Sequence, residues 1–174
     1  MRELIDDPFY EQMKAYKNCI IDFCLIEDDV PYQGYRSHKD AILFAMCKII
    51  ERDIEYQLKA EIDFYKDKPE DIDEEPFPWS MDMGKAKAKC LNAVLPDWYA
   101  FWEAPHKTGY GKDDFMKMNS ILFPKGVEML DVYEWTTDWS NYFDAGHEWW
   151  GTACFSVYDR NMDRYVVMMA STTD

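Results

Sequence analysis

A histidine and two carboxylates lie within five residues of one another near the end of the chain, at Asp144, His147 and Glu148. Such groups can form a general acid–base pair or part of a metal site. The segment lacks the H-x-x-x-H spacing of a helical metal site, however, and a local turn at Gly146 explains the same residues. We therefore assign no catalytic residue, metal ligand or cofactor, and these three residues would be catalytic only if the protein were a small enzyme.

The same part of the chain is unusually aromatic, because four of the seven tryptophans fall within residues 135–150. Core packing explains roughly half of these rings, and tryptophan and tyrosine are enriched at binding hot spots. The adjacent Trp149 and Trp150 would point to opposite faces of an extended segment, so one of them would be exposed. The predicted binding anchors are Trp135, Trp139, Tyr142 and one of Trp149 or Trp150.

Acidic residues number 34 and basic residues 19, which gives a net charge of −15. This balance argues against binding to a nucleic-acid backbone or an anionic membrane, since both require a basic surface. It fits a basic protein partner, although solubility alone would also explain it. One acidic cluster lies in a proline-containing loop at about 67–78, and its predicted binding residues are Asp71, Asp73, Glu74 and Glu75.

The five cysteines show no paired zinc spacing, and no G-x-S-x-G nucleophile motif or P-loop occurs. Cys19, Cys24, Cys47 and Cys90 fall among apolar residues of predicted helices, which indicates buried free thiols. An odd number of cysteines fits a reducing compartment. No signal-peptide core and no run of 18 apolar residues is found, so we expect a cytoplasmic protein that does not enter a membrane.

Hydrophobic spacing predicts helices first and strands last. The predicted helices cover about 8–27, 37–65, 80–95 and 113–122, and a strand is predicted at 129–134. Residues 152–158 and 164–171 alternate or are rich in β-formers around a turn, which is typical of a β-hairpin. The chain is predicted to be one α+β domain, with N-terminal helices packed on a small antiparallel sheet that ends in this hairpin.

The segment Trp139…Tyr142-Phe-Asp-Ala-Gly146-His-Glu-Trp-Trp-Gly151, with Val157-Tyr and Val166-Val…Ala170-Ser-Thr-Thr-Asp174, resembles the ending of small, mostly uncharacterised bacterial proteins. The resemblance covers about the last 40 residues. Some small acidic proteins of this kind are immunity proteins of bacterial toxin systems. The resemblance implies such a role and identifies no functional residue.

The sequence therefore leaves three functions open. The first is a non-enzymatic acidic inhibitor that occludes the basic active surface of a toxin such as a nuclease, with the acids and aromatic anchors above as its contacts. The second is a small enzyme or ligand-binding protein with an aromatic pocket around His147 and Glu148. The third is a nucleic-acid mimic, which requires acids at phosphate-like spacing on one surface.

Overall fold

The computed structural model describes residues 1–16, 19–64, 78–91, 109–148 and 151–171. Its centre is one six-stranded antiparallel sheet with the order β1-β2-β6-β5-β4-β3. The α+β fold predicted from the sequence is confirmed, and the C-terminal hairpin supplies two central strands. The strands are β1 (Arg2–Glu3), β2 (Ile21–Glu27), β3 (Ala88–Leu91), β4 (Leu130–Trp135), β5 (Thr152–Asp159) and β6 (Arg164–Ser171).

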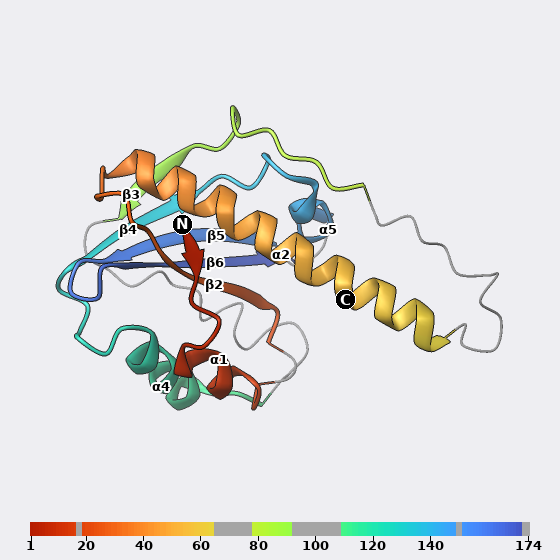
Figure 1. Ribbon diagram of the computed structural model, residues 1–174, viewed down its shortest axis with the longest axis horizontal. Helices are drawn as coiled ribbons and strands as arrows, with labels where there is room; N and C mark the ends of the chain where they lie inside the picture. Colours follow the sequence, from red (N-terminus) through yellow and green to blue (C-terminus); the bar gives the residue numbers. More distant parts are fainter. Residues whose placement is uncertain (17–18, 65–77, 92–108, 149–150, 172–174) are drawn as a thin grey trace.

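Helices cover both faces of this sheet. The long helix α2 (Tyr35–Phe64) crosses one face, while α1 (Pro8–Met13) and α4 (Lys112–Leu122) lie together on the other side (Figure 1). The 3-10 helix η2 (Asn141–Phe143) and the short helix α5 (Asp144–Glu148) follow β4 and pack near the end of β6. Each sheet face therefore has its own hydrophobic core.

The long helix α2 was predicted from its apolar face, and that prediction is confirmed. Ile42, Ala45, Met46 and Ile49 are buried against the sheet, with Glu51 and other charged residues toward solvent. The helix begins at Tyr35, two residues before its predicted start at residue 37. The predicted helix at 113–122 and the strand at 129–134 are also found, as α4 and β4.

The predicted helix over residues 8–27 is wrong. Among its described residues, only the first turns are helical, since α1 ends at Met13, and Ile21–Glu27 form the strand β2 beside β6. Phe23 and Leu25 enter the core under α1 and α4, whereas Cys24 and Ile26 enter the core under α2. A strand buried on both faces is apolar at nearly every position, so its periodicity does not distinguish it from a buried helix.

The predicted helix at 80–95 is also wrong within the described residues. Residues 88–91 form the strand β3, which pairs with β4 along one side, and Met81 forms an isolated bridge with Ser140. Cys90 is consequently exposed rather than buried, and Cys19 and Cys47 are only partly buried, while Cys24 is buried as expected. Packing against β4 determines the structure here.

Among the described residues, no helix has both the length and the apolar composition needed to cross a lipid bilayer.

Candidate functional site

Two of the predicted aromatic anchors are core residues. Trp135 is 3% exposed and Trp139 is 1% exposed, and both pack in the core beneath α2. The indole nitrogen Nε1 of Trp135 donates to Ser156 Oγ at 2.8 Å, and the Trp139 ring meets Phe143 edge to face at 5.5 Å. Neither indole is on the surface that a partner would meet in this conformation.

The residues of the acid–base alternative do not converge. Asp144, His147 and Glu148 are all exposed along α5. His147 Nε2 shares a 2.8 Å hydrogen bond with Thr137 Oγ1, and Asp144 lines a hollow whose lining includes neither His147 nor Glu148. This geometry does not favour the enzyme hypothesis built on these residues.

The remaining predicted binding residues lie outside the described part of the chain. They are Trp149 and Trp150 after α5, and the loop acids Asp71, Asp73, Glu74 and Glu75.

A cavity of about 500 Å³ opens between α2 and the η2–α5 segment and is here named the Asp22 pocket. A volume of this size lies in the range of small-ligand sites, roughly 300–1,000 Å³. Among the predicted anchors that the structure describes, Tyr142 alone contributes to its wall. The lining consists of carboxylates, aromatic rings, a guanidinium and small groups: Asp22, Ile49, Arg52, Asp53, Tyr56, Trp79, Tyr142, Ala145 and Ser171.

Asp22 provides the deepest charge of this pocket. It lies in β2 on the face toward α2, and its Oδ2 accepts a 2.6 Å hydrogen bond from the Tyr142 hydroxyl. Burial raises the pKa of Asp22 above its ordinary value, although Tyr142 and the nearby Arg52 charge oppose this effect, and Asp53 adds to it. Burial and the Asp22 carboxylate likewise raise the pKa of Tyr142 well above 10.0.

A second carboxylate, Asp53, lines the pocket from α2. Its Oδ2 accepts a 2.6 Å hydrogen bond from Gln57 Nε2 one turn later. Partial burial raises the pKa of Asp53, and the bond from Gln57 opposes that rise. Within the part of the chain that the structure describes, neither Asp22 nor Asp53 forms an ion pair.

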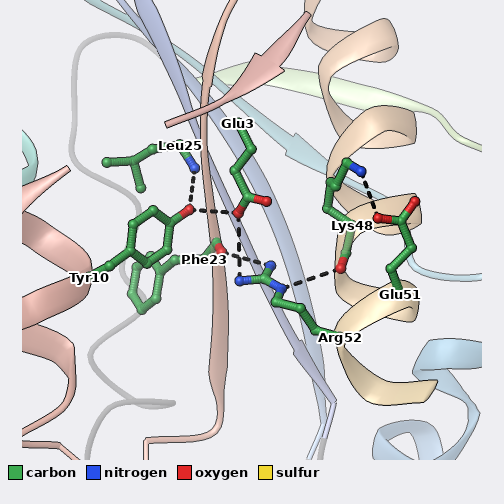
Figure 2. A network of polar contacts seen from close by, with 7 residues as sticks. All are labelled: Glu3, Tyr10, Phe23, Leu25, Lys48, Glu51 and Arg52. Carbon is green, nitrogen blue, oxygen red and sulfur yellow. Dashed lines mark hydrogen bonds and ion pairs between the residues drawn. The ribbon is translucent and has the colours of Figure 1, made fainter. Parts of the chain in front are cut away.

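Arg52 also lines the pocket, yet its hydrogen bonds are made elsewhere (Figure 2). Its guanidinium donates to the Phe23 carbonyl at 3.1 Å and to the Lys48 carbonyl at 3.3 Å, and lies 3.6 Å from Glu3 Oε1. Glu3 in turn accepts a 2.9 Å bond from the Tyr10 hydroxyl. The charge of Arg52 is therefore partly offset by Glu3, and its donors are directed to α2 and β2.

Aromatic rings form the outer wall of the pocket. The rings of Trp79 and Tyr142 have centroids 6.3 Å apart with planes tilted by 36°. Tyr56 on α2 is 73% exposed at the opening. Rings of this kind, beside carboxylates, present both π faces and negative charge to whatever enters.

A smaller hollow of about 280 Å³ lies next to the Asp22 pocket. Residues 79, 142 and 145 line the Asp22 pocket, while their chain neighbours 80, 141 and 144 line the smaller hollow. The two hollows therefore share a wall. The smaller hollow contains the carboxylates Asp82, Asp138 and Asp144 and one lysine, Lys85. Residues 141–145 thus separate two hollows that are both lined with acids.

Sequence reasoning missed Asp22 because it fell inside the predicted helix 8–27. One signal was available: Asp22 is the only charged residue in the apolar run Ile20–Ile26. A lone acid in such a run must be either paired or placed beside a cavity, since an isolated buried carboxylate is costly.

The described residues contain no group of three or more His, Cys, Asp or Glu side chains arranged to hold a metal ion. Comparison with family models, curated proteins and solved structures finds no match for this chain.

Proposed function

We propose that the protein is a non-enzymatic acidic binding protein of the immunity type, which inhibits a basic bacterial toxin domain, such as a nuclease, by occluding its active surface. The observation that carries this proposal is the pair of adjacent acid-lined hollows on either side of residues 141–145. They bring together Asp22, Asp53, Asp82, Asp138 and Asp144, which come from β2, α2 and the segments around η2.

The overall charge supports the same proposal. A net charge of −15 gives long-range attraction to a basic protein and accelerates the encounter at low salt. A nuclease active surface must be basic to hold phosphates, so an acidic protein placed over it would compete directly with the substrate.

The test is affinity capture from the native host with the tagged full chain, at about 0.01 M and about 1 M salt, where the Debye length is roughly 30 Å and 3 Å. We expect one basic protein that is retained at low salt and released at high salt. The purified partner should lose its toxic activity when an equimolar amount of this protein is added. Capture of no basic protein, or undiminished toxin activity, would overturn the proposal.

A ligand-binding protein is the second candidate, and the Asp22 pocket favours it, since its volume and aromatic wall are typical of small-molecule sites. In this alternative the ligand site lies at Asp22 and not at His147. To test this alternative, the protein is purified under native conditions and then denatured, and the small molecules that it releases are identified by mass spectrometry. A molecule recovered at about one equivalent from the parent, and lost from an Asp22→Asn variant, would support it; no such molecule would count against it.

A further inference from the structure

The carboxylates of the Asp22 pocket have hydrogen-bonding capacity left over. An ionised carboxylate offers about four lone-pair sites. Among the described residues, Asp22 accepts one side-chain hydrogen bond, from Tyr142, and Asp53 accepts one, from Gln57. Both line the cavity, and neither is ion-paired there, so their remaining acceptors face an open space.

The shape and chemistry of the wall narrow the choice of counter-ion. Tyr56, Trp79 and Tyr142 contribute rings to the same cavity as the two carboxylates. A guanidinium group matches this combination, because its planar fork binds carboxylates in pairs and its faces stack on aromatic rings. An ammonium ion can also lie over a ring face, but as a point charge it lacks the planar fork that pairs with carboxylates.

Arg52 does not fill this role itself. Its three donor contacts are with Phe23, Lys48 and Glu3 (Figure 2), and it forms no ion pair with Asp22 or Asp53 among the described residues. The lining therefore carries two carboxylates against one guanidinium, and Glu3 beside Arg52 adds further negative charge.

We propose, on the basis of the proposed function, that the Asp22 pocket receives one arginine side chain of the basic protein partner. The guanidinium hydrogen-bonds to Asp22 and Asp53 and stacks against the rings of Trp79 and Tyr142. The rest of the acidic surface attracts the partner, and this pocket selects the residue that anchors it.

The first experiment uses the full chain, labelled with nitrogen-15, and two small probes. N-acetyl-arginine amide carries the guanidinium, and N-acetyl-citrulline amide replaces it with a neutral urea of nearly the same shape. We expect the arginine probe to bind about ten-fold more tightly, with shifts centred on the amides of Asp22, Asp53 and Tyr142, because charge-assisted hydrogen bonds are the stronger kind. Equal binding of the two probes, or shifts located elsewhere, would overturn the proposal.

Matched variants test the residues. Asp22→Asn should weaken the arginine probe about ten-fold, and Asp53→Asn about three-fold, since Asp53 is nearer to solvent. Asp113→Asn removes the same charge from exposed α4, under the opposite face of the sheet, and should leave binding within about two-fold. Equal weakening by Asp22→Asn and Asp113→Asn would overturn the proposal, because it would reflect net charge alone.

The pH provides a readout that a merely structural role would not give. The groups that act on Asp22 are Cys19, Arg52, Asp53 and Tyr142. Burial raises the pKa of Asp22, and a guanidinium binds the ionised carboxylate in preference to the neutral carboxyl. The arginine probe should therefore bind more tightly as pH rises through the raised pKa of Asp22, and binding below that pKa should release a proton. Binding that is independent of pH, or that weakens as pH rises, would contradict the assignment.

The two proposals fail in different ways. With the captured partner, Asp22→Asn should raise the dissociation rate about ten-fold, whereas Asp113→Asn should change mainly the association rate. If capture succeeds but Asp22→Asn dissociates like Asp113→Asn, the pocket assignment is wrong and the proposed function stands. If no basic partner exists, the proposed function is wrong, and with it the partner arginine, whatever the probes show.

Discussion

Two polar sites lie between α2 and the sheet, and they differ in one property. The first, which we name the His38 cluster, comprises His38, Tyr32, Ser156 and Trp135 near the beginning of α2. The second is the Asp22 pocket, on the part of α2 around Asp53. Fifteen residues of helix separate His38 from Asp53, which is about 22 Å. The first site is closed, and the second opens on a cavity.

The His38 cluster satisfies its own hydrogen bonds. His38 is fully buried, with Nδ1 at 2.8 Å from Ser156 Oγ and Nε2 at 3.0 Å from the Tyr32 hydroxyl. Ser156, also fully buried, accepts the indole donor of Trp135 as well. Every side-chain donor and acceptor named here has a partner, so the cluster can stabilise the fold and offers nothing to a ligand.

The Asp22 pocket combines equally polar groups with open space and unused acceptors. A serine beside a histidine is the more familiar catalytic pair, yet here it is structural, whereas an aspartate in a strand faces the cavity. Access to a cavity, rather than residue type, separates the proposed binding site from the closed cluster. Substitutions in each of the two sites test this contrast.

The largest effect is expected for Ser156→Ala, which removes the shared partner of Trp135 and His38. Two buried nitrogen groups would lose their hydrogen bonds, at roughly 2 kcal/mol each, so the free energy of unfolding should fall by about 4 kcal/mol. Urea unfolding measures it. The exposed Ser120→Ala on α4 is the control and should stay within about 0.5 kcal/mol. A loss as small as the control's would mean that the cluster is not closed.

The next effect concerns pH and His38. Burial lowers the pKa of His38 from 6.5 to about 4. A histidine with a lowered pKa favours the folded state above pH 6.5, and this stability is lost as pH falls toward 4, because the unfolded chain binds the proton first. The shift corresponds to about 3 kcal/mol. We expect the difference in unfolding free energy between the parent and His38→Gln to narrow as pH falls from 6.5 to about 4. A difference that stays constant over these pH values would show that folding leaves the pKa of His38 unchanged.

A smaller effect is expected for Tyr142→Phe in the Asp22 pocket. The change removes one hydroxyl that donates to Asp22 and leaves the ring in place. Because Asp22 faces a cavity and can be solvated there, the unfolding free energy should fall by about 1 kcal/mol or less. Thermal or urea unfolding beside Ser156→Ala gives the direct comparison. A loss as large as that of Ser156→Ala would mean that the pocket is as closed as the His38 cluster.

The sequence predicted those parts of the fold in which one face is apolar and the other polar. The helix α2 was found in this way, and the turn residues between β5 and β6 identified the C-terminal hairpin. The strand β2 was missed because both of its faces are buried, which removes the alternation that identifies a strand. The strand β3 was missed because its pairing with β4 is a long-range contact that local patterns do not contain.

The candidate site was predicted only in part, for the same reason. Tyr142 was found because it lies in a conspicuous aromatic segment, and it does line the Asp22 pocket. Asp22 is 120 residues away in the chain, so only the fold brings it to the Tyr142 hydroxyl. Trp135 and Trp139 were as conspicuous as Tyr142, yet they are buried, because aromatic residues serve cores and binding sites equally well.

The smallest expected effect is the cost in stability of the ionised Asp22 carboxylate in the open site. Burial raises the pKa of Asp22, so the neutral carboxyl favours folding at low pH, and this contribution is lost as pH rises from about 3.8 through the raised value. Asp22→Asn keeps an oxygen that can accept from Tyr142 but has no charge. Its unfolding free energy should equal that of the parent at low pH and slightly exceed it at pH 7.

Urea unfolding of the parent and Asp22→Asn across this pH range measures the effect, with Asp113→Asn as the matched charge control. A variant less stable than the parent at pH 7 would show that the Asp22 carboxylate is already satisfied inside the fold, and the contrast with the His38 cluster would disappear. A more stable variant would show that the protein retains an ionisable group at a cost to its own stability. Residues that reduce stability in this way are characteristic of binding sites, because the missing partner charge comes from the ligand.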